Sequence, residues 1–178
     1  SLEKLIEKVD KKEHPEWIKE FRELEAEEKR VVVGNDLSPT KIGLTMGEVI
    51  RHINEFKADD AILVTDVGQH QMVAWRYFQY KTSRTQVTSG GLGTMGFSLP
   101  AALGAQLHDF SKEVICVVGD GGIQMTIQEL GAIMQTKAPV KVVLLNNNFL
   151  GMVRQWQQLF FDKRYSFTEL DNPDFIKI

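Results

Sequence analysis

The stretch Gly119–Asn148 decides the fold, and it reads GDGGIQMTIQELGAIMQTKAPVKVVLLNNN. An unbroken apolar run, Val114–Val118, precedes it and predicts a strand that is buried on both faces. Apolar residues then recur at helical spacing after the glycines, at Ile123, Ile127, Leu130 and Met134. Val140–Leu145 predicts a second buried strand. Together these segments predict one βαβ unit whose helix begins just after GDGG.

This unit is expected to bring Asp120 and Asn147 to one edge of a sheet. A strand–helix–strand crossover is almost always right-handed and joins parallel neighbours, so both residues should emerge at the carboxyl edge, where α/β proteins bind ligands. The glycines around Asp120 let backbone N–H groups approach a phosphate. Oxygen ligands beside a phosphate suit Mg²⁺. The alternative is purely local, because Asp often caps a helix and Asn often forms turns.

Composition excludes several classes of function. The chain has 178 residues, a formal net charge of −3 and no basic cluster, which argues against a nucleic-acid partner. No apolar run approaches membrane-spanning length and the start does not resemble a signal peptide, so we expect no membrane association and a cytoplasmic location. The single cysteine, Cys116, is interpreted as a core residue. The four histidines lack metal-ligand spacing, which argues against zinc.

The fold class follows from length and from the pattern of elements. A chain of this size can bury one substantial core. We therefore expect a three-layer α/β domain, with a mainly parallel sheet and helices on both faces, after a short helical N-terminal preface. Residues 1–12 and the residues after Pro15 each show one apolar helical face. They either pack on the α/β domain or form the tail of a preceding domain, and we favour the tail.

The domain boundary is predicted at the Ser38-Pro39 linker. Residues 1–38 are then the tail and linker, and residues 39–178 are the α/β domain. The sequence lacks an initiator methionine and ends inside an apolar pattern at Ile178. We therefore expect a piece of a longer polypeptide, with the α/β domain truncated at its C-terminal end.

One further loop is expected at the carboxyl edge after a short buried strand, Ala61–Thr65. The polar sequence DVGQHQM, residues 66–72, follows this strand directly. Its residues Gln69 and His70 are well placed for a ligand. From composition alone, a solvated loop or the start of a helix explains these two residues equally well.

A second loop, SGGLGTMG at residues 89–96, follows another short predicted strand at 85–88. Its four glycines let the backbone approach a planar ring. Met95 is apolar within this loop, so it either fills the core or supports a bound ligand. A helix is predicted next, with Pro100 in its first turn. Upstream, Thr45-Met46-Gly47-Glu48 fits a capping box at the start of another helix.

A last helix is predicted after the Asn triplet, with Met152, Val153, Trp156, Leu159 and Phe160 on one face. A stripe of Met and aromatic residues at this spacing usually belongs to a core. One turn beyond a metal and phosphate site, the same residues could instead line a substrate pocket.

Five groups of motifs together closely resemble the catalytic subunit of acetolactate synthase, also called acetohydroxyacid synthase. They are VTDVGQHQM from Val64, SGGLGTMGFSLPAALGA from Ser89, GDGG with its later Asn-Asn, GMVRQW from Gly151, and FFDKRYS with DNPDF. GDG with Asn-Asn is typical of all thiamine diphosphate enzymes, whereas GQHQM, GLGTMG and GMVRQW point to this family. The chain departs from the usual pattern at Gly122-Ile123 and at Asn148-Phe149.

The resemblance implies a role for individual residues. Asp120, Asn147 and the backbone carbonyl of Phe149 would hold Mg²⁺, and Met152 and Trp156 would line the pocket for the acceptor substrate. Met95 would prop thiamine diphosphate in its bent form. The implied cofactor-binding residues are Val67, Gly68, Gln69, His70, Gly93, Met95, Gly119, Gly121, Gly122 and Met152.

The resemblance also implies a reaction and its partners. Thiamine diphosphate would drive decarboxylation of pyruvate and joining of the two-carbon unit to a second 2-keto acid, pyruvate or 2-ketobutyrate, in branched-chain amino acid biosynthesis. FAD in the full-length enzyme would bind mostly outside this stretch. A homodimer is expected, and a regulatory subunit is a further expected partner.

One part of the implied active site is expected elsewhere. The activating glutamate of this family lies in the N-terminal domain of a neighbouring subunit, so no residue here takes a catalytic role, and we expect this piece alone to be inactive. A related carboligase or keto-acid decarboxylase is an alternative. A module that binds a phosphate ligand without ketol chemistry is another, although no Walker lysine and no dinucleotide GxGxxG after a strand is present.

Overall fold

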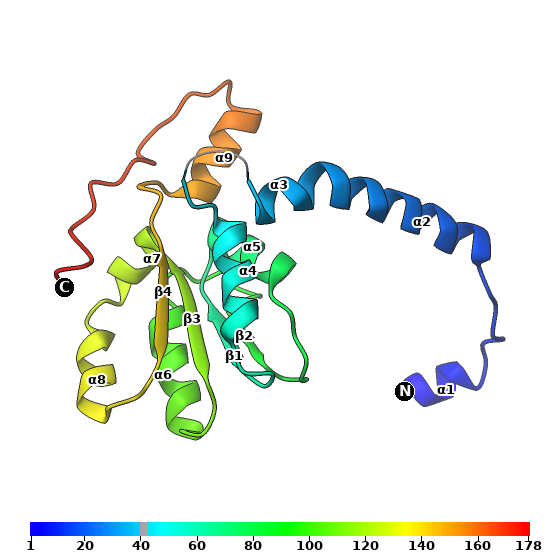
Figure 1. The fold of residues 1–178 in the computed structure, drawn as a ribbon, viewed down its shortest axis with the longest axis horizontal. Coiled ribbons are helices and arrows are strands. Elements are labelled where there is room, and N and C mark those ends of the chain that lie inside the picture. The colour runs from blue at the N-terminus through cyan, green and yellow to red at the C-terminus, as the bar shows by residue number, and fades with distance from the viewer. Residues whose placement is uncertain (40–42) are drawn as a thin grey trace. The chain divides into compact units, whose positions relative to one another are not determined.

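The computed structural model describes residues 1–39 and 43–178. Its contacts divide the chain into two compact units, Ser1–Ile42 and Gly43–Ile178, whose positions relative to one another are not determined (Figure 1). The predicted domain boundary after residue 38 stays a prediction, because compactness does not identify the domain to which the first helices belong.

The first unit is helical. It contains α1 (Leu2–Ile6), α2 (Pro15–Glu28), the π-helix η1 (Lys29–Val33) and α3 (Gly34–Leu37). Pro15 begins α2, where its missing N–H is tolerated. The prediction of a first helix over residues 1–12 was too long, since α1 ends at Ile6. Its apolar face is exposed, and a short helix without a packing partner gains little stability.

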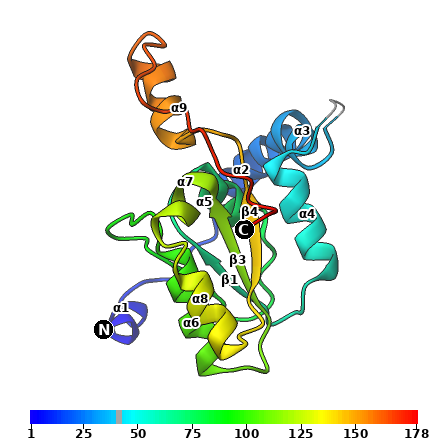
Figure 2. The same ribbon diagram turned by 90° about the vertical axis from the view of Figure 1, so that its left-hand side faces the viewer.

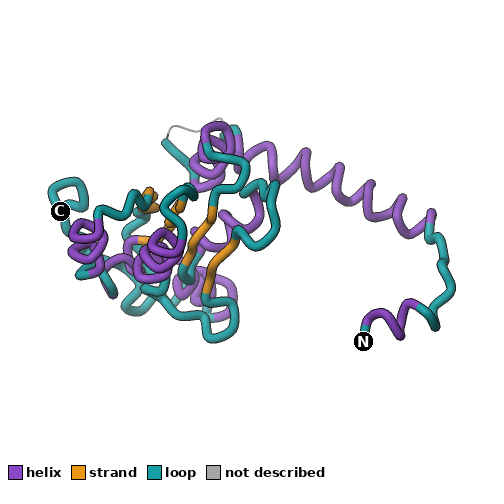
Figure 3. The backbone as a smooth tube through the Cα atoms, turned by 90° about the horizontal axis from the view of Figure 1, so that it is seen from below, coloured by secondary structure: helices purple, strands orange, loops and turns teal. Residues whose placement is uncertain are grey.

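The second unit is built on a four-stranded parallel sheet in the order β2-β1-β3-β4. Figure 3 draws the strands in orange among the helices. The strands are β1 (Ile62–Thr65), β2 (Gln86–Thr88), β3 (Val114–Gly119) and β4 (Lys141–Leu145). Every residue of β3 is buried, as predicted from its apolar run. The carboxyl ends of β3 and β4 are in register, because Gly119 pairs with Leu145.

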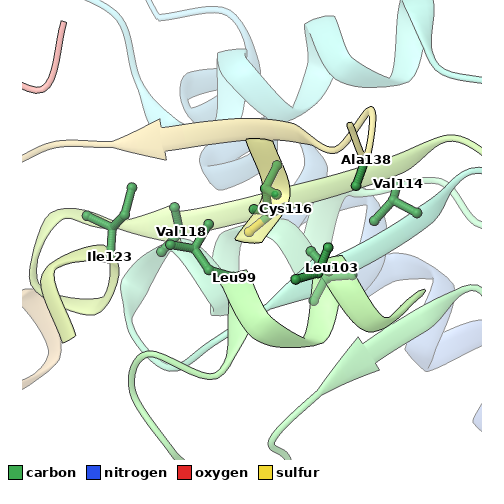
Figure 4. Close-up of a cluster of buried hydrophobic side chains, with 10 residues drawn as sticks. Leu99, Leu103, Val114, Cys116, Val118, Ile123 and Ala138 are labelled. Carbon is green, nitrogen blue, oxygen red and sulfur yellow. The ribbon is translucent and has the colours of Figure 1, made fainter. Parts of the chain in front are cut away.

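Helices cover both faces of the sheet, so the predicted three-layer α/β fold is confirmed (Figure 2). On one face α6 (Ser98–His108) and α8 (Glu129–Thr136) pack against the strands. The core on this side includes Leu99, Leu103, Val114, Cys116, Val118, Ile123 and Ala138 (Figure 4). On the other face lie α5 (Gln69–Tyr77), packed on β3, and α4 (Met46–Phe56), packed on α5.

The helix inside the βαβ unit differs from its prediction. It begins at Asp120 itself, as α7 (Asp120–Met125), and α8 is separated from it by three residues that start at Thr126. The loop at Gly96 packs against this break, since Thr126 Oγ1 donates a hydrogen bond to the Gly96 carbonyl at 2.8 Å. Met134, expected on the buried stripe, is 77% exposed.

The second strand of the unit is also less buried than predicted. In the described residues β4 pairs only with β3, and of its five residues Leu145 alone is buried. A strand at the edge of a sheet has one neighbour instead of two, which explains why Val142, Val143 and Leu144 are only partly covered.

Two further helix predictions can be compared with the structure. The capping box is confirmed, because Glu48 N–H donates to Thr45 Oγ1 at 3.2 Å and Thr45 N–H donates to Glu48 Oε2 at 3.0 Å. The last helix, α9 (Gly151–Phe160), buries none of its residues, so its apolar stripe is not core in this structure.

In residues 1–39 and 43–178, no helix combines the length and the apolar character that a membrane crossing needs. The cytoplasmic location stays a prediction.

Candidate functional site

A small pocket opens at the carboxyl ends of β1, β3 and β4. Its cavity volume is about 40 Å³, enough for a few water molecules or for an ion with part of its shell. Both Asp120 and Asn147 line it, as expected from their positions after β3 and β4. The lining residues are Met46, Val67, Gly68, Gln69, His70, Met95, Gly119, Asp120, Gly121, Gly122, Leu145, Asn147, Phe149, Leu150 and Gly151.

Asp120 is the only carboxylate among the lining residues, and its side chain is hydrogen-bonded to a residue that does not line the pocket. The residue is 3% exposed, and its Oδ2 accepts a hydrogen bond from Asn172 Nδ2 at 2.7 Å. Among the described residues, Oδ1 has no hydrogen-bond partner. One oxygen of the carboxylate is therefore left for a ligand in the pocket.

Asn147 and Phe149 form a tight turn on the opposite wall. Asn147 Oδ1 accepts the Phe149 N–H at 3.0 Å, and Asn147 Nδ2 contacts Gln69 Oε1 at 3.5 Å. Phe149 also forms an antiparallel bridge with Glu169. The Arg154 guanidinium lies 4.2 Å from the centre of the Phe149 ring. These contacts fix the loop after β4, whose residues Asn147 and Phe149 line the same pocket as Asp120.

His70 lies beneath the loop after β1 and is only 5% exposed. Its Nε2 is 2.5 Å from Asp66 Oδ1, and Asp66 Oδ2 accepts the Gly96 N–H at 2.9 Å. The fully buried Asp66 carboxylate thus joins α5 to the glycine loop before α6. The predictions did not include Asp66, although its position directly after a buried strand was a usable signal.

Gln69 connects the pocket with α9. Its Nε2 donates to Gln155 Oε1 at 2.9 Å, and its Oε1 would be 2.3 Å from a Cβ at Gly151. A more open depression of about 460 Å³ adjoins the pocket here and shares Gln69, Asn147, Phe149 and Gly151 with it. Arg154 also lines this depression.

Most of the predicted site residues meet at this pocket, and three do not line it. Gly93 is exposed, with φ of +65°, in the loop before α6. Met152 lies on α9, and so does Trp156, which is 57% exposed and packs against Phe160 with ring centres 5.0 Å apart. Conversely, Met46, Leu145, Leu150 and Gly151 line the pocket but were not predicted to do so.

The donor set fits a small, hard cation. It comprises one carboxylate, the Asn147 carboxamide oxygen and nearby backbone carbonyls, and Mg²⁺ prefers such oxygen ligands while keeping several waters. The described residues contain no cluster of three His, Cys, Asp or Glu side chains. The oxygen donors of this pocket are of the kind that Mg²⁺ binds.

Residues 66–178 match the family model of the thiamine pyrophosphate enzyme, C-terminal TPP binding domain. The chain belongs to this family. The matched residues include the whole GDGG to Asn148 stretch and the DVGQHQ loop, so the thiamine diphosphate family expected from GDG with Asn-Asn is confirmed.

The chain is also similar to several curated proteins. It is 50% identical over 131 residues to the acetolactate synthase isozyme 2 large subunit of Escherichia coli strain K12, covering 73% of this chain and 24% of that protein. It is 54% identical over 129 residues to the acetolactate synthase large subunit of Lactococcus lactis, covering 72% of this chain and 22% of that protein. The chain thus spans about a quarter of the length of these relatives.

Among solved structures, the chain resembles a thiamine diphosphate-dependent 4-hydroxybenzoylformate decarboxylase of Rhodococcus jostii RHA1. The TM-score is 0.71 and the identity is 27%, with 78% of this chain and 26% of that chain covered. The fold of this thiamine-pyrophosphate-binding domain is therefore also found in a thiamine diphosphate-dependent decarboxylase.

Proposed function

We propose that the chain is the thiamine-diphosphate-binding part of an acetolactate synthase. The observation that carries the proposal is the pocket of Asp120, Asn147 and the GDGG backbone, in a chain about half identical to acetolactate synthase large subunits. The whole enzyme would decarboxylate pyruvate and join the two-carbon unit to a second 2-keto acid, in branched-chain amino acid biosynthesis.

In this proposal the chain's residues bind and orient the cofactor. Asp120, Asn147 and the Phe149 carbonyl hold Mg²⁺, and the backbone at Gly121 and Gly122 contacts the diphosphate. Thiamine diphosphate, when bound, supplies the electron sink for carbanion chemistry. The loop of Val67, Gly68, Gln69 and His70 closes the diphosphate end, and the remaining cofactor contacts proposed from the resemblance are Gly93, Met95, Gly119 and Met152.

The acceptor substrate, pyruvate or 2-ketobutyrate, is proposed to reach this edge of the sheet from the side of α9. Gln69 supports this, because it lines the pocket and bonds to Gln155 on that helix. Met152 and Trp156 of α9 are proposed to shape the acceptor pocket. FAD in the whole enzyme and a regulatory subunit also belong to the proposal, and they rest on the resemblance alone.

Self-association is proposed as well, through the exposed apolar side of α9. Trp156, Leu159 and Phe160 are 57%, 63% and 65% exposed. Exposed apolar patches mark interaction surfaces, and two-fold pairing is the commonest closed arrangement. Sedimentation velocity should show a dimer at high concentration that Leu159→Glu dissociates. A monomer at every concentration would exclude the homodimer for this chain.

A binding assay tests the cofactor assignment directly. Calorimetric titration of the chain with thiamine diphosphate and Mg²⁺ should give weak, metal-dependent binding, whereas ATP and NAD should not bind. Asp120→Asn keeps the shape of the side chain but removes its charge, so it should weaken binding at least tenfold. Equal binding of ATP, or binding that needs no divalent ion, would favour a generic phosphate-binding module.

A chimera tests the reaction. The matching 131 residues of the E. coli large subunit are replaced with those of this chain, and acetolactate formation from pyruvate is measured with thiamine diphosphate, Mg²⁺ and FAD. The chimera should form acetolactate, and its Asp120→Ala variant should not. A folded chimera that binds cofactor but forms no acetolactate would contradict the synthase assignment.

A keto-acid decarboxylase is the second candidate, favoured by the structural similarity to the Rhodococcus decarboxylase. The products separate the two proposals. A decarboxylase releases an aldehyde from a 2-keto acid, while a synthase joins two keto acids. Aldehyde as the main product of the chimera, with little acetolactate, would favour this candidate.

A further inference from the structure

The C-terminal segment, residues 161–178, follows α9. The carboxamide of Asn172 in this segment lies near α7 and the end of β4. Its Nδ2 donates to Asp120 Oδ2 at 2.7 Å, and it lies 3.0 Å from Asn146 Oδ1 and 3.1 Å from Asn148 Oδ1. Its own oxygen accepts from Gln124 Nε2 at 2.9 Å. An NH₂ group has two hydrogens, so three acceptors at these distances share them. Both polar atoms of the side chain are therefore engaged.

The contacts also determine which way the carboxamide is turned. A flipped Asn172 would place its oxygen against the oxygens of Asp120, Asn146 and Asn148, which cannot donate in their present orientation. The flipped side chain would also present its NH₂ group to the NH₂ group of Gln124. Only the present orientation satisfies these contacts, so Asn172 acts as the donor toward Asp120.

The backbone of the C-terminal segment is anchored without this side chain. Leu150 N–H donates to the Thr168 carbonyl at 2.8 Å, and Leu170 N–H donates to the Asn148 carbonyl at 2.9 Å. These bonds hold residues 168–170 along the loop after β4. The Asn172 side chain is therefore not needed to place the segment, and its shortest contact is with the buried carboxylate of Asp120.

We propose that Asn172 is a positioning residue that holds the Asp120 carboxylate so that Oδ1 faces the pocket. Hydrogen bonds from outside a metal site commonly orient its ligands, and their loss weakens metal affinity by about 10- to 100-fold. Asn172 does not line the pocket. This inference rests on the proposed function, since it assigns a metal to Asp120.

The test uses the chain with Mn²⁺ in place of Mg²⁺, in the presence of thiamine diphosphate. Free Mn²⁺ is measured by electron paramagnetic resonance during a titration. Asn172→Ala should raise the Mn²⁺ dissociation constant about tenfold, because the Asp120 carboxylate loses its fixed rotamer. Gln124→Ala removes the hydrogen bond to the Asn172 oxygen, so the Asn172 carboxamide can turn. This variant should raise the Mn²⁺ dissociation constant by a smaller factor. Gln124 is exposed, so this variant keeps the test usable if Asn172→Ala does not fold.

Asn54→Ala is the matched control. Both polar atoms of the Asn54 carboxamide are also hydrogen-bonded, since Nδ2 donates to the Tyr77 carbonyl at 2.8 Å and Oδ1 accepts from Gln79 N–H at 2.9 Å. Asn54 does not line the pocket. Urea unfolding of Asn172→Ala and Asn54→Ala shows whether each variant folds and how much stability it loses. The control should lose stability and keep the wild-type Mn²⁺ affinity.

The outcomes are distinguishable. Unchanged Mn²⁺ affinity in both Asn172→Ala and Gln124→Ala overturns the positioning role while leaving the metal assignment intact. An equal loss of affinity in Asn54→Ala also overturns it, because the effect is then one of general stability. No Mn²⁺ binding by the wild-type chain, or binding that Asp120→Asn does not weaken, overturns the proposed metal site and this inference with it.

Discussion

The imidazole of His70 lies so close to Gly119 that a Cβ at Gly119 would be 2.8 Å from its Nδ1. The ring cannot easily retreat, because its Nε2 is 2.5 Å from Asp66 Oδ1 and the side chain is 5% exposed. Glycine at position 119 therefore makes room for a side chain from α5, which packs on β3. The start of the GDGG stretch depends on a residue 49 positions earlier in the chain.

Gly119→Ala should destabilise the chain and distort the pocket. The added methyl group would force His70 away from Asp66 or shift the end of β3, and such overpacking costs about 1–3 kcal/mol. Urea unfolding measures this loss. Gly131→Ala on α8 is the control, because nothing lies within 4 Å of its Cβ position, and it should stabilise the helix by roughly 0.5–1 kcal/mol.

A Gly119→Ala variant that unfolds at the wild-type urea concentration would show that His70 moves freely. In that case the glycine would not be required for packing, and the contact with Asp66 would be weaker than its distance indicates.

Much of this fold could be predicted because the signals are local. The β-branched apolar run Val114–Val118 specifies a strand covered on both faces, and all five of its residues are buried. The right-handed crossover then determines that Asp120 and Asn147 share an edge. The capping box at Thr45 needs only residues three positions apart. Each of these features depends on a short pattern or on a general rule of chirality.

The rest depends on contacts that sequence spacing does not encode. At the break after Met125, Thr126 donates a hydrogen bond to the carbonyl of Gly96, which lies 30 positions earlier in the chain. The contact of Asn172 with Asp120 joins residues 52 positions apart. It could not be predicted without knowing the path of the C-terminal segment. The partial burial of β4 follows from its place at the edge of the described sheet, which its apolar sequence does not reveal.

Asp66→Asn should reduce stability by about 1–3 kcal/mol, because it replaces one acceptor in a fully buried site with a donor. The two carboxylate oxygens contact His70 Nε2 and the Gly96 N–H. A carboxamide must therefore either present its NH₂ group to the Gly96 N–H or require the His70 tautomer that carries its proton on Nδ1. Urea unfolding at pH 7 measures the change. Asp59→Asn is the control, since the Asp59 side chain is 73% exposed in its ion pair with Lys81 and should contribute little. Similar small losses in both variants would contradict a structural role for Asp66.

Cys116 should resist thiol reagents while the chain is folded. Burial raises the pKa of its thiol from 9.0 to about 12, so almost no thiolate exists at pH 8. A disulfide reagent should therefore label the unfolded chain in 6 M guanidinium at least about 100-fold faster than the native chain. Rapid stoichiometric labelling of the native chain would contradict the burial of this strand.

The same pKa difference predicts how stability depends on alkaline pH. Because the folded-state pKa lies above the unfolded value, the contribution of this thiol is fully present below pH 9. It is lost as the pH rises from 9 toward 12, since only the unfolded chain then releases the proton. Cys116→Ala should remove this part of the alkaline slope in urea unfolding measured at increasing pH.

Trp156→Leu should change stability little, although a stripe of aromatic residues usually belongs to a core. Trp156 is 57% exposed and its ring contact is with Phe160, so its replacement should shift the unfolding free energy by about 0.5 kcal/mol or less. Leu99→Ala, at a fully buried position on α6, is the contrasting variant and should cost about 2–5 kcal/mol. In the chimera, Trp156→Leu should instead change the ratio of products formed from pyruvate and 2-ketobutyrate, because the proposed acceptor pocket lies along α9. A large loss of stability with an unchanged product ratio would indicate that Trp156 packs in a core and does not shape the acceptor pocket.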